Sequence, residues 1–115
     1  MRQLLLLRHA KSGWDDPRLS DHERPLNVRG QDAAQAMGAE FRRLRLSPEL
    51  VLVSTARRTM ETLRALEPFG DSTLLDPLDS LYLAPAERML DILRNTPETV
   101  RSVLVIGHNP AMQNL

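Results

Sequence analysis

The sequence predicts an α/β fold with three layers, α/β/α, in which a mostly parallel sheet lies between two layers of helices. Two observations support this prediction. Apolar runs of strand length alternate along the chain with amphipathic segments of helix length. Prolines and glycines lie between these segments and mark turns. Because such alternation builds βαβ units, it predicts parallel strands with helices on both faces of the sheet.

Short apolar runs bounded by polar or turn residues are predicted to be strands. They comprise residues 3–7, 50–53, 73–75 and 103–106, of which 73–75 is the shortest. Residues 8–28 are polar, contain Gly13 and two prolines, and are predicted to form a loop. Another loop, with Pro77 and Pro85, is expected after the third run. The helices are therefore expected in the remaining segments.

The first helix is predicted from apolar residues that recur at helical spacing, namely Ala33, Met37, Phe41 and Leu44. Asn27 precedes this segment, and an asparagine side chain can accept a hydrogen bond from a backbone N–H group of the first turn. We therefore expect a helix that begins after Asn27 and turns these four residues toward the core.

Two further helices are predicted downstream. The second has Ser54 or Thr55 as its cap and runs to about Leu66, where the approach to Pro68 ends it. The third is predicted from the Met and Leu stripe at residues 89–93, which is expected to pack in the core.

Composition excludes several classes of function. Lys plus Arg equals Asp plus Glu at 15 each, so the zero net charge gives no indication of a nucleic-acid or membrane partner. The absence of cysteine excludes disulfides, thiolate metal sites and a cysteine nucleophile. The longest aliphatic run, residues 4–7, is far shorter than the ~20 residues that span a bilayer. A single domain in the cytoplasm is therefore expected.

Side chains suited to phosphate chemistry follow three of the predicted strands. They are Arg8 and His9 after the first strand, Arg58 after the second and His108 after the last. In open α/β sheets, ligands bind beyond the carboxyl ends of the strands, so these side chains are expected to meet at one edge. Arginine matches phosphate oxygens with a planar fork of donors. Histidine serves as a neutral nucleophile near pH 7, so this set can transfer a phosphoryl group without a metal.

Several segments, in order along the chain, resemble motifs of the histidine phosphatase (phosphoglycerate mutase-like) superfamily. They are residues 7–15 (LRHAKSGWD), 26–30 (LNVRG), 54–62 (STARRTMET) and 107–110 (GHNP). The third motif singles out Arg58 rather than Arg57 as the family's second arginine. Within the superfamily the chain is most similar to small phosphohistidine phosphatases of the SixA type, through RHAKS and through DHERPL at residues 21–26.

This resemblance implies a phosphoglycerate mutase-like fold and a hydrolase mechanism. His9 would take the phosphoryl group as a covalent phosphohistidine, which water then hydrolyses. Arg8, Arg58 and His108 would bind the phosphoryl oxygens, with Ser12 as a further substrate-binding residue. No cofactor and no metal are expected. The expected partner is a phosphorylated protein, such as a phosphotransfer domain, or a small phosphate ester.

Two features depart from the family pattern. Ala10 replaces the glycine that usually follows the nucleophile. The usual glutamate acid has no clear counterpart, and Asp79, with Asp76 nearby, is the candidate in the corresponding region. Weak acid assistance suits phosphohistidine, whose P–N bond breaks readily once the imidazole is protonated. It suits an alkyl phosphate poorly, because an alkoxide needs a donated proton.

Three functions therefore remain open. The leading one is a phosphohistidine phosphatase that acts on a signalling protein. The alternatives are a small-molecule phosphomonoesterase or mutase, and a non-catalytic phosphate-binding module. Asn109 and Pro110 predict the start of a helix, yet the sequence stops at Leu115 and family members of this type run on. Residues 1–115 are thus expected to be a single histidine phosphatase domain that lacks its C-terminal part.

Overall fold

The computed structural model describes residues 3–8 and 16–108 of the chain. The helices and strands follow in the order β1 (Gln3–Arg8), α1 (Val28–Arg43), β2 (Leu50–Ser54), α2 (Arg57–Leu66), β3 (Leu74–Leu78), α3 (Ala86–Arg94) and β4 (Ser102–Gly107). Two short 3-10 helices, η1 (Asp21–Glu23) and η2 (Asp79–Leu81), precede α1 and α3. Each strand and helix predicted within the described residues is therefore present, and the helix expected to start at Asn109 and Pro110 lies outside them.

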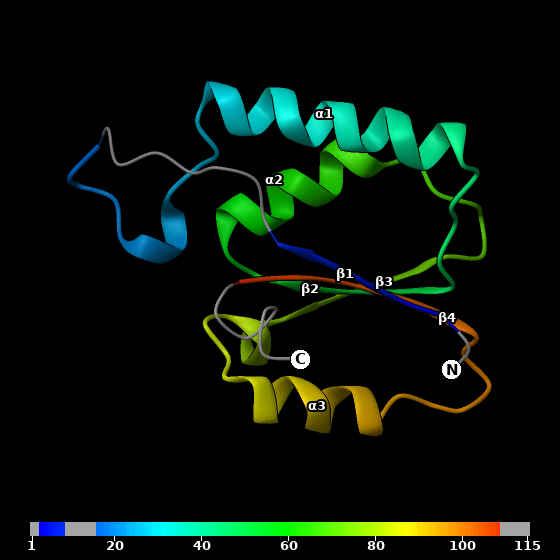
Figure 1. Cartoon of the computed structure of the whole chain (residues 1–115). Helices are drawn as coiled ribbons and strands as arrows, with labels where there is room; N and C mark the ends of the chain where they lie inside the picture. The colour runs from blue at the N-terminus through cyan, green and yellow to red at the C-terminus, as the bar shows by residue number, and fades with distance from the viewer. Residues whose placement is uncertain (1–2, 9–15, 109–115) are drawn as a thin grey trace.

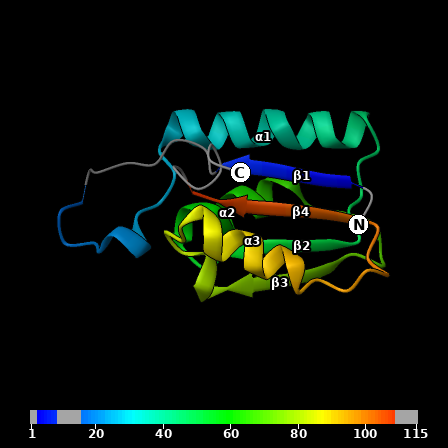
Figure 2. The ribbon, with the colours of Figure 1, turned by 60° about the horizontal axis from the view of Figure 1, so that its bottom comes forward.

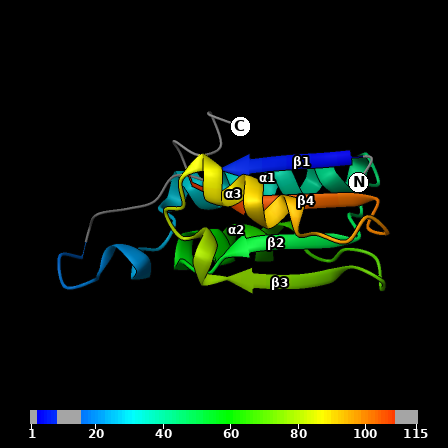
Figure 3. The ribbon, with the colours of Figure 1, turned by 90° about the horizontal axis from the view of Figure 1, so that it is seen from below.

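The described strands form one parallel sheet in the order β1-β4-β2-β3. Helices α1 and α2 cover one face of this sheet and α3 covers the other (Figure 1). The view from below places β1 and β3 at opposite edges (Figure 3). This arrangement confirms the predicted three-layer α/β/α fold with a parallel sheet.

The central strands β2 and β4 separate two apolar clusters, one on each face of the sheet. Val51 and Val53 pack on the face that carries Leu63 of α2, whereas Leu52 packs on the face that carries Met89 of α3. Successive side chains of a strand point to opposite faces, so a continuous apolar run serves both layers at once. The central strands are therefore apolar throughout, as the sequence predicted.

The start of α1 is confirmed, but of its predicted buried face only Phe41 is buried. The Asn27 side chain accepts a hydrogen bond from the Gly30 N–H group at 2.8 Å, so Asn27 caps the helix. Ala33, Met37 and Leu44 are exposed, whereas Gly38 is buried. A Cβ atom on Gly38 would lie 2.2 Å from a backbone oxygen of α2, so the helix turns its small residues toward its neighbour.

Two further details differ from the sequence prediction. Neither Ser54 nor Thr55 caps α2, because the N-cap is Ala56, which has no side-chain hydrogen bond. Strand β3 is longer than expected and includes Pro77, which was predicted to lie in a loop. Proline lacks an N–H donor, and an edge strand tolerates this because only one of its sides is paired. Among the described residues, no helix is long and apolar enough to cross a membrane.

Candidate active site

Each described strand delivers a polar residue to the same edge of the sheet. Arg8 ends β1 and lies opposite Gly107, the residue before His108. Ser54 ends β2 and Asp79 directly follows β3. The strands all point toward this edge, where the η1 segment also lies (Figure 2). This carboxyl edge is the position at which parallel sheets bind ligands.

Arg58 and His108 meet at this edge in the protein interior. Each is 2% exposed, and Arg58 Nη2 lies 3.5 Å from His108 Nδ1. His108 Nε2 lies 2.8 Å from the hydroxyl of Ser54. Both ring nitrogens of His108 therefore have a polar neighbour, and which of them donates depends on the tautomer of the imidazole. The imidazole is thereby held between the first turn of α2 and the end of β2.

Asp21 of η1 is the principal described partner of the buried Arg58. Arg58 Nη1 donates to the backbone oxygen of Asp21 at 2.6 Å, and Nη2 donates to Asp21 Oδ2 at 3.1 Å. Arg24 Nε donates to the other carboxylate oxygen at 3.0 Å, and the Tyr82 hydroxyl donates to Oδ2. Partial burial alone would raise the pKa of Asp21, but hydrogen bonds from Tyr82, Arg58 and Arg24 hold that pKa at about 2.

Tyr82 joins the neighbouring groups into one cluster. Its ring makes edge contacts with the rings of His22 and His108, at centroid distances of 4.8 Å and 5.6 Å. The Arg58 guanidinium carbon lies 6.0 Å from the centroid of the same ring. Burial and the adjacent Asp21 carboxylate raise the pKa of the Tyr82 hydroxyl, which therefore remains a donor at neutral pH.

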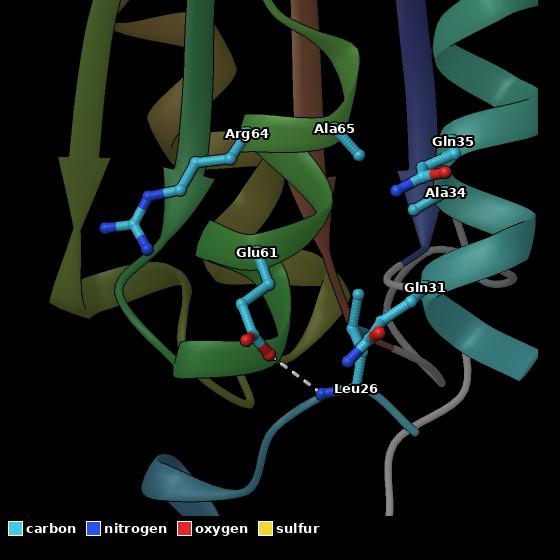
Figure 4. A pocket seen from close by; sticks show the side chains of 7 residues that line it. All are labelled: Leu26, Gln31, Ala34, Gln35, Glu61, Arg64 and Ala65. Atoms are coloured by element: carbon cyan, nitrogen blue, oxygen red, sulfur yellow. Dashed lines mark hydrogen bonds between the residues drawn. The ribbon is translucent and has the colours of Figure 1, made fainter. Parts of the chain in front are cut away.

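The segment that carries Asp21 is tied to α2 at a second point. The Leu26 N–H group donates to Glu61 Oε1 at 2.8 Å, and Leu26 itself is buried (Figure 4). Glu61 lies on the same helix as Arg58. The segment thus contacts α2 on both sides of Arg24, which fixes Asp21 against Arg58.

Asp79, the candidate acid, belongs to a separate hydrogen-bonded chain. Thr55 Oγ1 donates to Asp79 Oδ1 at 2.5 Å and lies 3.0 Å from His22 Nε2. Asp79 is exposed, and Asp76 lies exposed in the edge strand β3. The Thr55 hydroxyl therefore holds Asp79, whereas Asp76 lies within β3, before the carboxyl end of that strand.

The structure therefore brings together part of the predicted site. Arg58 and His108 are in contact, and Arg8 lies at the adjacent strand end. His9 and Ser12 lie outside the described residues. Within residues 3–8 and 16–108, no group of three His, Asp or Glu side chains is arranged to hold a metal ion.

The sequence interpretation missed Asp21 and Tyr82. Asp21 begins the DHERPL segment that carried the resemblance to SixA-type proteins, so a signal for its importance was present. Tyr82 stands in no motif, and its carboxylate partner is 61 residues away in the chain. Periodicity and spacing cannot reveal a pair of this kind.

A cavity of about 360 Å³ lies away from this cluster, between α1 and α2 (Figure 4). It is lined by Leu26, Gln31, Ala34, Gln35, Glu61, Arg64 and Ala65. None of the predicted site residues that the structure describes lines it, so its volume gives no information about the chemistry of Arg58 and His108 at the carboxyl edge.

A family model, the histidine phosphatase superfamily (branch 1), matches residues 4–79, which include Arg8 and Arg58. The chain belongs to this superfamily. The resemblance inferred from the motifs is thereby confirmed, as is the fold class.

Relatives of this chain include an uncharacterized chloroplastic protein of Arabidopsis thaliana, 34% identical over 94% of this chain and 54% of the relative. The chain therefore spans about half the length of that relative. A SixA protein from Agrobacterium tumefaciens has a similar structure, with a TM-score of 0.90, 33% identity, and coverage of 99% of this chain and 74% of that one. The structure of the protein histidine phosphatase SixA complexed with tungstate gives a TM-score of 0.81 at 30% identity, covering 98% of this chain and 73% of that one.

Proposed function

We propose that the protein is a metal-independent phosphatase that uses His9 as its nucleophile and acts on phosphohistidine in a signalling protein. The observation that carries the proposal is the buried contact between Arg58 and His108, at the strand ends next to Arg8. A cationic and an imidazole group at such an edge suit an anion with several oxygens. Similarity to a SixA protein that binds the oxyanion tungstate supports the same ligand class.

The proposed reaction has two steps. In the first, the His9 imidazole nitrogen attacks phosphorus, the bond from phosphorus to the substrate nitrogen breaks, and the protonated imidazole of the substrate leaves. In the second, water attacks phosphorus, the bond to His9 breaks, and inorganic phosphate is released. Arg8, Arg58 and His108 stabilise the charge on the equatorial oxygens in both transition states.

The carboxylates of the described cluster favour phosphohistidine over an alkyl phosphate as the substrate. Asp21 is the carboxylate beside Arg58, and its pKa of about 2 leaves it without a proton to donate at neutral pH. Asp79 is hydrogen-bonded to Thr55 instead. Within residues 3–8 and 16–108, neither of these two carboxylates is arranged to donate a proton, which suits a leaving group that solvent can protonate; imidazole is such a group whereas an alkoxide is not.

The nucleophile is tested by trapping the intermediate. Brief incubation of the wild-type protein with a ³²P-phosphorylated phosphotransfer protein is expected to give acid-labile label on the enzyme. His9→Ala is expected to give no label and no turnover. Arg57→Ala is the matched control, because Arg57 is half exposed and pairs with Glu61 at 3.8 Å. Label and turnover in His9→Ala at the wild-type level would contradict the mechanism.

The substrate class is tested with a panel of sugar phosphates and phosphorylated phosphotransfer proteins at matched concentrations. Turnover of the phosphoproteins at higher kcat/KM is expected. Preference for the sugar phosphates would favour a small-molecule phosphatase or mutase. Phosphate binding without hydrolysis of any phosphoramidate would favour a non-catalytic binding module.

A further inference from the structure

We infer that Asp21 is an internal counter-anion of Arg58 and that it sets how tightly the site holds phosphate. By counter-anion we mean a fixed carboxylate that neutralises the arginine and competes with the ligand for it. Asp21 is a positioning residue in this account, since it acts through Arg58. The inference rests on the proposed function because that proposal makes phosphate the ligand of Arg58.

The geometry of the pair is that of a fixed partner rather than a chance surface contact. The side chain of Arg58 is 3% exposed, whereas that of Asp21 is 35% exposed. Asp21 engages two terminal nitrogens of the guanidinium, one through its backbone oxygen and one through its carboxylate. A buried arginine needs such compensation, because an unpaired buried charge is strongly destabilising.

The groups around Asp21 keep its carboxylate charged and in place. Arg24 and Tyr82 donate to it from other directions, and Arg24 is 9% exposed. The resulting low pKa means that the carboxylate stays ionised throughout the physiological pH range. The cluster therefore contains a permanent negative charge beside the arginine, before any ligand binds.

A bound phosphoryl group would share Arg58 with this carboxylate. A guanidinium has five N–H donors in a planar fork, so a carboxylate and a phosphoryl group can bind it together. The two anions would also repel each other across a partly buried site, where screening by salt is weak. We therefore expect Asp21 to weaken the binding of inorganic phosphate, the product, and so to favour its release.

Replacement of Asp21 by asparagine tests the inference, because the amide keeps an acceptor oxygen but carries no charge. Isothermal titration of the whole protein with inorganic phosphate and with tungstate is expected to give Kd values about tenfold lower in Asp21→Asn than in wild type. Asp16→Asn is the matched control. Asp16 forms an exposed 3.0 Å pair with Arg18, and its replacement is expected to leave both Kd values unchanged.

A merely structural role of Asp21 predicts that Asp21→Asn does not bind phosphate more tightly than wild type. If Asp21 only maintained the fold, Asp21→Asn would bind phosphate more weakly or equally, and either result would overturn the inference. Tyr82→Phe provides a second measurement if Asp21→Asn does not fold. The Tyr82 hydroxyl and Arg58 both donate to Asp21 Oδ2. Without the hydroxyl, the carboxylate is expected to pair more strongly with Arg58. Phosphate is then expected to bind about two- to threefold more weakly, and tighter or unchanged binding would contradict the inference.

Different results would contradict the counter-anion inference and the proposed phosphatase function. A wild-type protein that binds phosphate and hydrolyses phosphohistidine, but whose Asp21→Asn variant binds phosphate no more tightly, would overturn only the counter-anion. A wild-type protein that binds no phosphate at all would overturn both.

Discussion

The central strands and the Arg58–His108 contact at the carboxyl edge of the sheet are both buried, but they are built differently. Val51 and Leu104 in the central strands are fully buried apolar residues. At the edge, Arg58 and His108 are equally inaccessible yet polar, and each is fixed by named hydrogen-bond partners. Apolar burial is non-directional, whereas a buried polar group needs a partner in a defined place. The first region is therefore expected to determine stability, and in our proposal the second determines which ligand fits.

If this contrast holds, substitutions at the carboxyl edge are expected to have the largest effect on activity. Arg58→Ala is expected to lower the turnover of a phosphorylated phosphotransfer protein by at least about 100-fold, because a charge that stabilises the transferring phosphoryl group is lost. Arg57→Ala, one residue away and half exposed, is expected to change kcat/KM by less than about twofold. Steady-state kinetics measures both variants. Equal losses of kcat/KM in Arg58→Ala and Arg57→Ala would contradict the expected difference between the two arginines.

The largest effect on stability is expected in the central strands. Leu104→Ala should lower the free energy of unfolding by about 3 kcal/mol, because it removes buried apolar surface and leaves a cavity. Leu74→Ala, at a position that is 66% exposed in β3, should change it by less than about 0.5 kcal/mol. Urea denaturation measures both, and similar costs at the two sites would show that the sheet centre is not the main source of stability.

A smaller loss of stability is expected where α1 crosses α2. Alanine is the better helix former, so Gly38→Ala would be stabilising on an exposed helix. Here the added Cβ atom would lie 2.2 Å from the Ala65 carbonyl oxygen, and the helices must separate. We expect a net loss of about 1–3 kcal/mol by urea denaturation. A net gain in stability would mean that this close approach does not constrain the fold.

The smallest effect is a pH dependence of stability at the edge. The folded-state pKa of Asp21, about 2, lies below the ordinary value for aspartate, so the carboxylate stabilises the fold above about pH 4. This contribution is expected to decrease as the pH falls from about 4 toward 2. Thermal unfolding of wild type and Asp21→Asn between pH 6 and pH 2 measures it. The difference in Tm should narrow as the pH falls, and a constant difference would contradict the low pKa.

The same contrast explains how much of the structure could be predicted from the sequence. The central strands and the Asn27 cap depend on residues close together in the chain, so periodicity and capping preference located them. The buried face of α1 was misplaced because Met37 is apolar, whereas close packing on α2 selects the small Gly38. Apolar pattern alone does not report how closely two helices approach.

The candidate site was predictable to the extent that strand ends position it. Arg8 ends β1, Arg58 lies in the first turn of the helix after β2, and His108 follows β4, so a parallel sheet brings them to one edge. The partners that fix Arg58 were not predictable in this way. Asp21 lies 37 residues from Arg58 and 61 residues from Tyr82, and no local rule connects them.

The most direct measurement of the central claim is a crystal structure of the protein with tungstate bound. The account predicts one anion at the carboxyl edge, within hydrogen-bond distance of Arg8, Arg58 and His108 and in contact with the His9 imidazole. An anion bound elsewhere, for instance in the cavity between α1 and α2, with no contact to Arg58, would contradict the account.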